Sequence, residues 1–407
     1  MRNLLRTLIL VFVRILGLPA AYAAARRTRK DPPPDLRILL VRPDHLGDMV
    51  MTTPVLQALR SQAPEAQITM LGGPWSSEVV ARHPAIDHLI TLPFPGFQRT
   101  AQRPLEPYRL LFSTAQQLRR KRYDIALNLR PDFWWGGALL YLAGIPRRVG
   151  YAIEPGTPFL THALPFPVEE HATVSSLRLA SAGLQACGLP ALTEPFTPAR
   201  YPLQFAPTTQ ERAFVSERLA SAGIGADDAL VVIHPGTGGA VKLWRIEAWS
   251  HIADRLSTTD ILPAAAHIVL TGSPKERPML EEITRDMHTQ ALLVTDMTVG
   301  QLAALLGRAQ LVLGVDNGPL HLAVAQDTLT LHIFGPSNPR IFGPWGTPGR
   351  HLIVAATERC PGCPAIPCGR LDFASEELPA HPCVRRISEQ QVEQAIELLV
   401  ASRSNRT

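Results

Sequence analysis

The chain alternates between short apolar runs and longer segments in which apolar residues have helical spacing, and it does so twice. The apolar runs are rich in branched side chains, which is typical of buried parallel strands. They lie at residues 36–42, 67–71, 86–92, 125–129 and 148–151 in the first half, and at 230–234, 266–271, 311–315 and 328–334 in the second. Helices are expected between them, among them 209–222, 247–256, 276–287 and 318–325. This order predicts two α/β domains, each built on a parallel sheet.

A proline-rich stretch separates the two halves. Its four prolines are Pro195, Pro198, Pro202 and Pro207, and we expect the domain boundary near residue 205. The predicted organisation is a tail and Pro-rich spacer at 1–35, an N-terminal α/β domain at 36–205, a C-terminal α/β domain at 206–387 and a final amphipathic helix at 388–407. Two similar α/β halves favour a ligand site in a cleft between them.

The N-terminal segment carries most of the chain's excess positive charge. The formal net charge is +5, and the first thirty residues hold seven arginines and lysines and no acid. The remainder therefore has 33 basic against 35 acidic side chains. The body of the protein lacks the basic surface that nucleic acid requires, so we expect no nucleic-acid partner.

The apolar stretch 4–25 has three interpretations. A spanning helix needs about 20 apolar residues, but Arg14 lies near the middle and Pro19 follows. A cleaved signal peptide would use the small residues at 21–23, but Arg14 shortens its apolar region. An interfacial helix tolerates Arg14 because a long side chain reaches the headgroups. We favour the interfacial helix, held on the cytoplasmic face by the bases on both sides of the apolar run.

The first motif with candidate chemistry is Arg42-Pro-Asp-His-Leu-Gly-Asp48, directly after the first strand. Ligands of open α/β sheets bind at the carboxyl ends of the strands, so Asp48 is placed to face a ligand. The competing interpretation is an ordinary helix cap, because Asp is a common cap residue. Thr53-Pro54 also resembles a helix start, so the helix after Asp48 is expected to begin or kink there.

Two further motifs follow strands of the second half. His234-Pro-Gly-Thr237-Gly-Gly-Ala-Val-Lys242 is a loop of small residues ending in a lysine, which suits a phosphate group although it lacks the Walker spacing. Gly314-Val-Asp316-Asn-Gly318-Pro-Leu-His321 runs into a helix start, where backbone N–H groups bind anions. Each has a plain structural alternative: a surface loop for the first, and capping residues with a core histidine for the second. Because both lie at the same sheet edge, together they predict a diphosphate site.

Four of the five cysteines form a separate cluster. Cys360, Cys363, Cys368 and Cys383 lie near the C-terminus with His381 beside the last, whereas Cys187 stands apart. Four thiols are able to hold zinc, but this spacing matches no standard zinc pattern. Structural thiols or local disulfide bridges are the alternative, and bridges require an exported domain.

The motifs together resemble glycosyltransferase family 9, the heptosyltransferases of lipopolysaccharide. The stretches 38–60, 234–256 and 314–339 resemble the family's strand–loop–helix with its Gly-Asp pair, its phosphate loop, and its Asp-x-Gly-x-x-His segment. No G-x-G-x-x-G follows the first strand and no G-x-S-x-G is present, which disfavours a dinucleotide-binding enzyme and an α/β-hydrolase.

The resemblance implies a GT-B fold of two Rossmann-like domains, the N-terminal one (36–205) binding the acceptor and the C-terminal one (206–387) binding the nucleotide-sugar donor, with the last helix (388–407) packing back on the first domain. It also implies sugar transfer with inversion and without a metal. It implies Asp48 as the general base. It also implies the donor contacts: Thr237 and Lys242 to the diphosphate, Glu276 to the ribose, Met297 to the adenine, and Asp316, Gly318 and His321 to the sugar and phosphate. The chain departs from the family's pattern at Pro43, Asp44, His45 and Asn317.

The predicted function is therefore an inverting, metal-independent glycosyltransferase. It would move a heptose or similar sugar from an ADP-sugar to a lipopolysaccharide core or related lipid-linked glycan, at the cytoplasmic surface of the inner membrane. It would need no cofactor besides its nucleotide-sugar co-substrate, ADP-heptose. The alternatives are a nucleotide-sugar epimerase of the same fold and a non-enzymatic two-domain protein that binds a glycan or solute.

Overall fold

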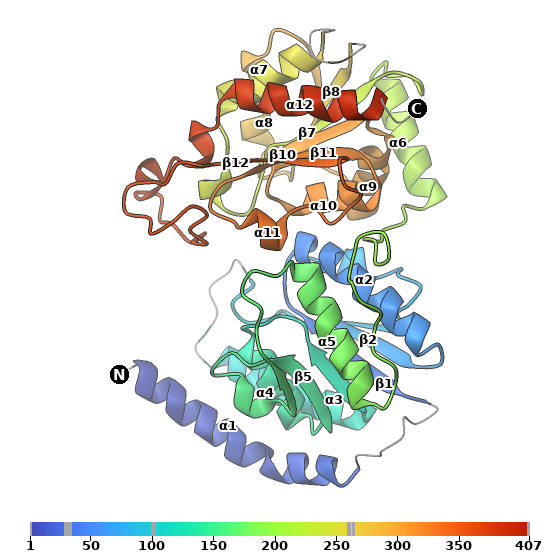
Figure 1. Cartoon of the computed structure of the whole chain (residues 1–407), viewed down its shortest axis with the longest axis vertical. Coiled ribbons are helices and arrows are strands. Elements are labelled where there is room, and N and C mark those ends of the chain that lie inside the picture. The colour runs from blue at the N-terminus through green and yellow to red at the C-terminus, as the bar shows by residue number, and fades with distance from the viewer. Residues whose placement is uncertain are drawn as a thin grey trace. The chain divides into compact units, whose positions relative to one another are not determined.

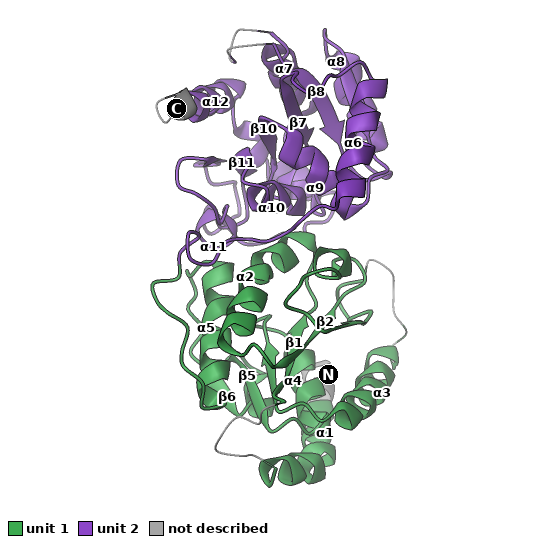
Figure 2. Ribbon diagram, turned by 90° about the vertical axis from the view of Figure 1, so that its right-hand side faces the viewer, with its two compact units in different colours: residues 1–196 green, residues 197–407 purple. Residues whose placement is uncertain are grey.

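The computed structural model describes residues 2–27, 35–98, 103, 105–258, 262 and 265–404. They form two compact α/β units, Met1–Phe196 and Thr197–Thr407 (Figures 1 and 2). The division precedes the expected boundary at 205 because the second unit holds the intervening stretch. Trp345 Nε1 donates to Tyr201 O at 2.7 Å, and Gln326 Nε2 donates to Phe205 O at 2.7 Å. The proline-rich spacer at 28–34 lies outside the described residues.

The first unit is built on a parallel sheet with the strand order β3-β2-β1-β4-β5-β6. The strands are β1 (Arg37–Arg42), β2 (Gln67–Gly72), β3 (His88–Thr91), β4 (Ile125–Asn128), β5 (Arg147–Tyr151) and β6 (His162–Leu164). The helices are α1 (Arg2–Ala25), α2 (Leu46–Gln62), α3 (Glu106–Lys121), α4 (Trp134–Leu142) and α5 (Ala172–Ala186). Helices α2 and α5 pack together, while α3 and α4 pack together and α1 lies on α4. The central strands are buried along nearly their whole length, as their continuous apolar runs predict.

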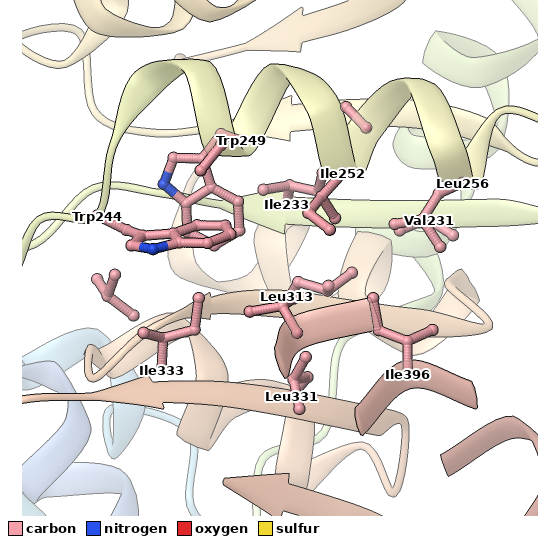
Figure 3. Packing of buried hydrophobic residues seen from close by; sticks show 14 of the residues in the cluster. Val231, Ile233, Trp244, Trp249, Ile252, Leu256, Leu313, Leu331, Ile333 and Ile396 are labelled. Carbon is pink, nitrogen blue, oxygen red and sulfur yellow. The ribbon is translucent and has the colours of Figure 1, made fainter. Parts of the chain in front are cut away.

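The second unit repeats this plan, with the parallel order β12-β11-β10-β7-β8-β9. The strands are β7 (Leu230–His234), β8 (His267–Thr271), β9 (Ala291–Val294), β10 (Leu311–Val315), β11 (Leu329–Phe334) and β12 (His351–Ala355). The helices are α6 (Thr209–Ser221), α7 (Ile246–Leu256), α8 (Arg277–Asp286), α9 (Val299–Arg308), α10 (Gly318–Ala325), α11 (Pro339–Phe342) and α12 (Glu389–Ser404). The apolar side of α7 packs on the strands, with the Trp244 and Trp249 rings edge to face at 4.9 Å (Figure 3).

The last helix differs from its predicted position on the first domain. Helix α12 packs on the second unit, against α7 and β12. Its residues Val392, Ile396 and Leu399 form an apolar stripe that is fully buried in that unit's core, and Ile396 lies beside Leu331 in Figure 3. An ion pair of 2.9 Å between Arg245 and Glu389 also attaches the helix to the segment before α7. The apolar stripe therefore completes the core of its own unit.

Helix α2 does not begin at Thr53-Pro54, which was one of the two expectations for this segment. It runs without interruption through Thr53-Pro54. Proline has no N–H, so the carbonyl of Val50 lacks its helical donor. The hydroxyl of Thr53 supplies one instead, donating to Val50 O at 2.7 Å. The Thr53 hydroxyl therefore replaces the hydrogen bond that Pro54 cannot make, and the helix continues. Asp48 remains in the first turn of α2.

Candidate active site

Asp48 lies at the carboxyl end of β1, in the first turn of α2. Its side chain is 30% exposed, and its Oδ1 lies 3.2 Å from Arg42 Nη2. The residue at the N-cap position is His45, whose side chain makes no capping hydrogen bond. The alternative interpretation, in which Asp48 is the N-cap of this helix, is therefore wrong.

A buried carboxylate that was not among the predicted site residues organises this end of the sheet. Asp44 is 1% exposed and lies between two guanidinium groups. Its Oδ2 is 2.9 Å from Arg42 Nε, and its Oδ1 pairs with Arg130 Nη1. Burial lowers the pKa of Arg130, but the carboxylates of Asp44 and Asp132 outweigh it, so the pKa is raised. Asp44 therefore fixes Arg42, which in turn contacts Asp48.

In the second unit, the two predicted anion-binding loops meet at Asp316. Lys242 Nζ donates to the backbone oxygen of Asp316 at 2.8 Å and lies 3.1 Å from its Oδ2. Thr237 Oγ1 donates to the same backbone oxygen at 3.4 Å. The structure thus brings Thr237, Lys242 and Asp316 together at the carboxyl ends of the neighbouring strands β7 and β10. The charge of Lys242 is balanced by Asp316, a pairing that the sequence did not predict.

Asn317 joins these loops and begins helix α10. Its Oδ1 accepts from the N–H of Leu320 at 3.2 Å, so it is the helix cap. Its Nδ2 donates to the carbonyls of His234 at 3.1 Å and Gly236 at 2.8 Å. Pro319 has no N–H, and Gly318 is the first residue of α10, a position whose N–H has no carbonyl within the helix to bond.

Glu276, at the N-cap position of α8, lies against Gly236 in the loop after β7. Its Oε2 accepts from the N–H and the hydroxyl of Ser273, both at 2.7 Å. A Cβ on Gly236 would come within 2.1 Å of Glu276 Oε1, so a larger residue there would require the Glu276 carboxylate to move. Behind them, burial lowers the pKa of His234 to about 4, with Glu276 opposing the shift, and its Nδ1 lies 2.9 Å from Thr271 Oγ1. His234 is therefore a neutral support for the loop.

The two remaining predicted donor residues lie at the margins of this assembly. His321 is buried on α10, with its ring centroid 6.0 Å from that of His332 on β11. Met297 is half-buried after the edge strand β9 and has no described contact with the lysine loop. The predicted donor residues thus follow β10, β7, β8 and β9, which are consecutive in the sheet.

The four clustered cysteines line one small pocket with His381. They are Cys360, Cys363, Cys368 and Cys383, and all five cysteines of the chain are free thiols. Among the described residues, no group of three or more His, Cys, Asp or Glu side chains is arranged to hold a metal ion. Burial raises the pKa of Cys383 to about 12, together with its neighbour Cys360. Cys360 and Cys383 are buried and Cys363 and Cys368 are half-buried, and Val241 of the lysine loop lines the same pocket.

Sequence comparison finds relatives along most of the chain. The family model for glycosyltransferase family 9 (heptosyltransferase) matches residues 111–365. Lipopolysaccharide heptosyltransferase 3 of Escherichia coli is 26% identical, over 74% of this chain and 83% of that protein. Lipopolysaccharide heptosyltransferase 1 of Pseudomonas aeruginosa is 27% identical, over 78% of this chain and 83% of that protein.

Solved structures share the architecture. The E. coli ADP-heptose lps heptosyltransferase II superposes with a TM-score of 0.67 at 19% identity, over 91% of this chain and all of that one. A family 9 glycosyltransferase of Veillonella parvula gives a TM-score of 0.71 at 24% identity, over 90% of this chain and 98% of that one. The two Rossmann-like units are the GT-B architecture that the sequence predicted. With the family model matching well over half of its residues, the chain belongs to glycosyltransferase family 9 and is a glycosyltransferase.

Proposed function

We propose that this glycosyltransferase transfers a heptose from ADP-heptose to a sugar of the lipopolysaccharide core or a related lipid-linked glycan. The observation that carries the proposal is the assembly of Thr237, Lys242 and Asp316 beside the start of α10. A cation and backbone N–H groups at the carboxyl edge of a parallel sheet suit a diphosphate. The names of the relatives support the donor, since one is an ADP-heptose lps heptosyltransferase and another was solved with ADP.

The donor is proposed to lie along four neighbouring strands. Lys242, Thr237 and the N–H of Gly318 would hold the diphosphate, which then competes with the carboxylate of Asp316 for the ammonium group. Glu276 would accept hydrogen bonds from the ribose hydroxyls. Met297 would cover the adenine, and Asp316 and His321 would face the sugar. Asp316 would thereby be released from Lys242 when the donor binds.

The reaction is proposed to be a direct displacement with inversion and without a metal. The acceptor hydroxyl loses its proton to the Asp48 carboxylate as its oxygen attacks the anomeric carbon. The bond from that carbon to the diphosphate breaks, and the electron pair stays on the leaving ADP. Lys242 and the Gly318 N–H would meet that charge. Arg42, held by Asp44, would orient the Asp48 carboxylate.

The protein is proposed to work at the inner-membrane surface, on α1. This is a helix long and apolar enough to cross a membrane, over Leu8–Ala25. In the first unit, however, one side of α1 is packed on α4: Val13 and Ala24 are buried, and Tyr141 Oη donates to Arg14 O at 2.9 Å. Its other side leaves seven large apolar residues 46–62% exposed, namely Leu8, Val11, Phe12, Ile15, Leu16, Leu18 and Tyr22. A helix held along a domain with an apolar outer side suits lying in a lipid surface.

A donor competition tests the proposal. The full-length protein is incubated with a core oligosaccharide and equal amounts of ADP-, UDP- and GDP-linked heptose, with and without EDTA, and the product is analysed by NMR. We expect transfer from the ADP donor, inverted anomeric configuration and no loss with EDTA. Preference for another base, retention, or loss of transfer with EDTA would each contradict the corresponding part, and release of an epimerised free sugar would favour the epimerase alternative.

A further inference from the structure

Three aromatic rings gather around the loop that leads from β1 to Asp48, and the reaction proposed above gives them no role. His45 follows β1, Trp75 follows β2 and Phe97 follows β3, so they extend from three consecutive strands of the first sheet. The Trp75 and Phe97 rings are nearly parallel, at 16°, with centroids 6.4 Å apart. The exposed His45 ring lies 5.7 Å from Trp75 and 6.4 Å from Phe97.

Trp75 is held in a fixed orientation. Its indole N–H donates to the backbone oxygens of Pro43 and Asp44, both at 3.0 Å. Its ring lies against Gly73, where a Cβ would come within 2.2 Å of it. Because the N–H is already satisfied by the backbone, what the half-buried indole offers a ligand is its apolar ring.

Phe97 is placed by a tight turn. Pro95 and Gly96 occupy the central positions, Gly96 has φ +84°, and the N–H of Phe97 donates to Phe94 O at 3.3 Å, which is the signature of a type II turn. Phe94 is fully buried and anchors the turn. The Arg130 guanidinium lies 5.1 Å from the Phe97 ring centroid and is itself held by Asp44 and Asp132. The turn and the Arg130 guanidinium therefore both hold the Phe97 ring in place before a ligand binds.

We propose that His45, Trp75 and Phe97 form a stacking platform for a pyranose ring of the acceptor; this rests on the proposed function, which puts the acceptor with Asp48. A pyranose has a face of weakly positive C–H groups, which matches the negative face of an aromatic ring. Its hydroxyls project at the rim, where the exposed imidazole of His45 is able to donate or accept a hydrogen bond.

The charges around the platform favour a neutral ring over an anionic group. Arg42 is paired with Asp44 and Asp48, and Arg130 is paired with Asp44 and Asp132. Neither guanidinium is left to neutralise a phosphate or carboxylate of the ligand. The platform therefore selects its ligand by ring shape and hydroxyl positions.

The test compares Phe97→Leu with Phe97→Tyr. Leucine keeps apolar volume and removes the ring face, so we expect the KM for a core oligosaccharide acceptor to rise about three- to tenfold, with the KM for the donor unchanged. Tyrosine keeps the ring and should restore the parent value. Phe112→Leu, at an exposed ring of α3 in the same unit, is the matched control and should change nothing. An unchanged acceptor KM, or an equal rise in the donor KM, overturns the platform.

A second measurement does not depend on turnover. In saturation-transfer NMR, irradiation of the aromatic protons should mark C–H protons of the bound oligosaccharide in the parent and in Asp48→Asn, and much less in Phe97→Leu. A parent protein that binds the oligosaccharide without this transfer overturns the platform alone. A parent protein that does not bind it overturns the proposed acceptor as well.

Discussion

At the scale of the residue, the proposed chemistry rests on side chains whose charges are already matched in the structure. Lys242 is paired with Asp316, and Arg42 is shared between Asp44 and Asp48. Such pairs keep ionised groups stable in half-buried positions and position them for a ligand that replaces one partner. Substitutions at these positions therefore have different expected effects on binding and on turnover.

Asp48→Asn tests the general base. The amide keeps the size of the side chain but cannot take a proton, so turnover should fall by about 10²–10⁴. Folding and ADP affinity should stay near the parent values, because Asp48 is not the cap of α2. Steady-state rates and ADP titration measure these effects. Near-native turnover in this variant would remove Asp48 from the role of base.

Lys242→Ala tests the diphosphate site. Losing one charge-assisted contact should weaken ADP binding about ten- to hundredfold, measured by calorimetry. The variant also leaves the Asp316 carboxylate without its cation, so that it would repel the diphosphate. The double variant Lys242→Ala/Asp316→Asn removes this repulsion, and comparing it with Lys242→Ala gives the loss that is due to the lysine alone. Lys121→Ala, at the end of α3, is the control. Unchanged ADP affinity in the single variant would exclude the loop from the site.

At the scale of the element, the sequence predicted the strands and their order along the chain better than the links between them. Continuous apolar runs at 36–42 and 230–234 became the buried strands β1 and β7 because both faces of a parallel sheet are covered. The start of α2 was ambiguous because Thr53-Pro54 has the composition of a helix start, and only the Thr53–Val50 hydrogen bond shows that the helix continues. The short strands β9 and β12, at the two edges of the second sheet, were not predicted because they have no comparable continuous apolar run.

The positions of the proposed site residues could be predicted where these residues follow a strand closely in sequence. Asp48 and the segment from Asp316 to His321 each follow a strand within a few residues. The role of Asp44 could not be predicted, because its partner Arg130 lies 86 residues away in the sequence. The pairing of Lys242 with Asp316, 74 residues apart, was hidden for the same reason. The position of α12 depended on which of two sheets its apolar stripe would cover, and an apolar stripe does not specify that.

Three histidines on the strands of the second sheet predict how stability depends on pH. Burial lowers the pKa of His234 and of His351 to about 4, and that of His332 well below its usual value. In the unfolded chain each would titrate near 6.5, so below that pH the unfolded state binds more protons. Stability should be constant above about pH 6.5 and should fall as the pH drops toward 4, by up to about 1.4 kcal/mol per pH unit for each histidine. Denaturant midpoints between pH 7.5 and 5 measure this slope.

A pair of variants assigns the slope to the buried rings. His351→Gln should make it shallower, whereas His88→Gln, at an exposed position on β3, should leave it unchanged. An equal effect of both variants, or a midpoint that does not move between pH 7.5 and 5, would contradict the assignment.

At the scale of the whole molecule, α1 is part of the first unit rather than an appendage. The Tyr141 ring lies against Gly17, where a Cβ would come within 2.1 Å of it, and Arg27 Nη2 donates to Gly144 O at 2.7 Å. Deletion of α1 would therefore uncover the apolar surface of α4. Membrane attachment is therefore better tested by substituting exposed apolar residues of α1 than by deleting the helix.

Phe12→Glu combined with Ile15→Glu should abolish flotation with vesicles that contain phosphatidylglycerol, because both side chains are more than half exposed on the outer side of α1. The Tm should not change, since neither residue contributes to the packing on α4. Phe112→Glu on α3 serves as the control and should still float. If the double variant floats like the parent, another surface attaches the protein to lipid.

The packing of α1 on α4 also has a consequence for synthesis. Helix α1 ends at Ala25 and its partner α4 ends at Leu142, so about 120 residues must be translated before the partner exists. At roughly 5–20 residues per second, the nascent helix has no protein surface to cover it for about 6 to 24 seconds. An apolar helix preceded and followed by bases will meet lipid or a chaperone in that interval. Under the proposed membrane attachment, lipid would cover the helix in that interval, so the ribosome would reach the membrane before the first domain folds and the domain would close on a helix already in place.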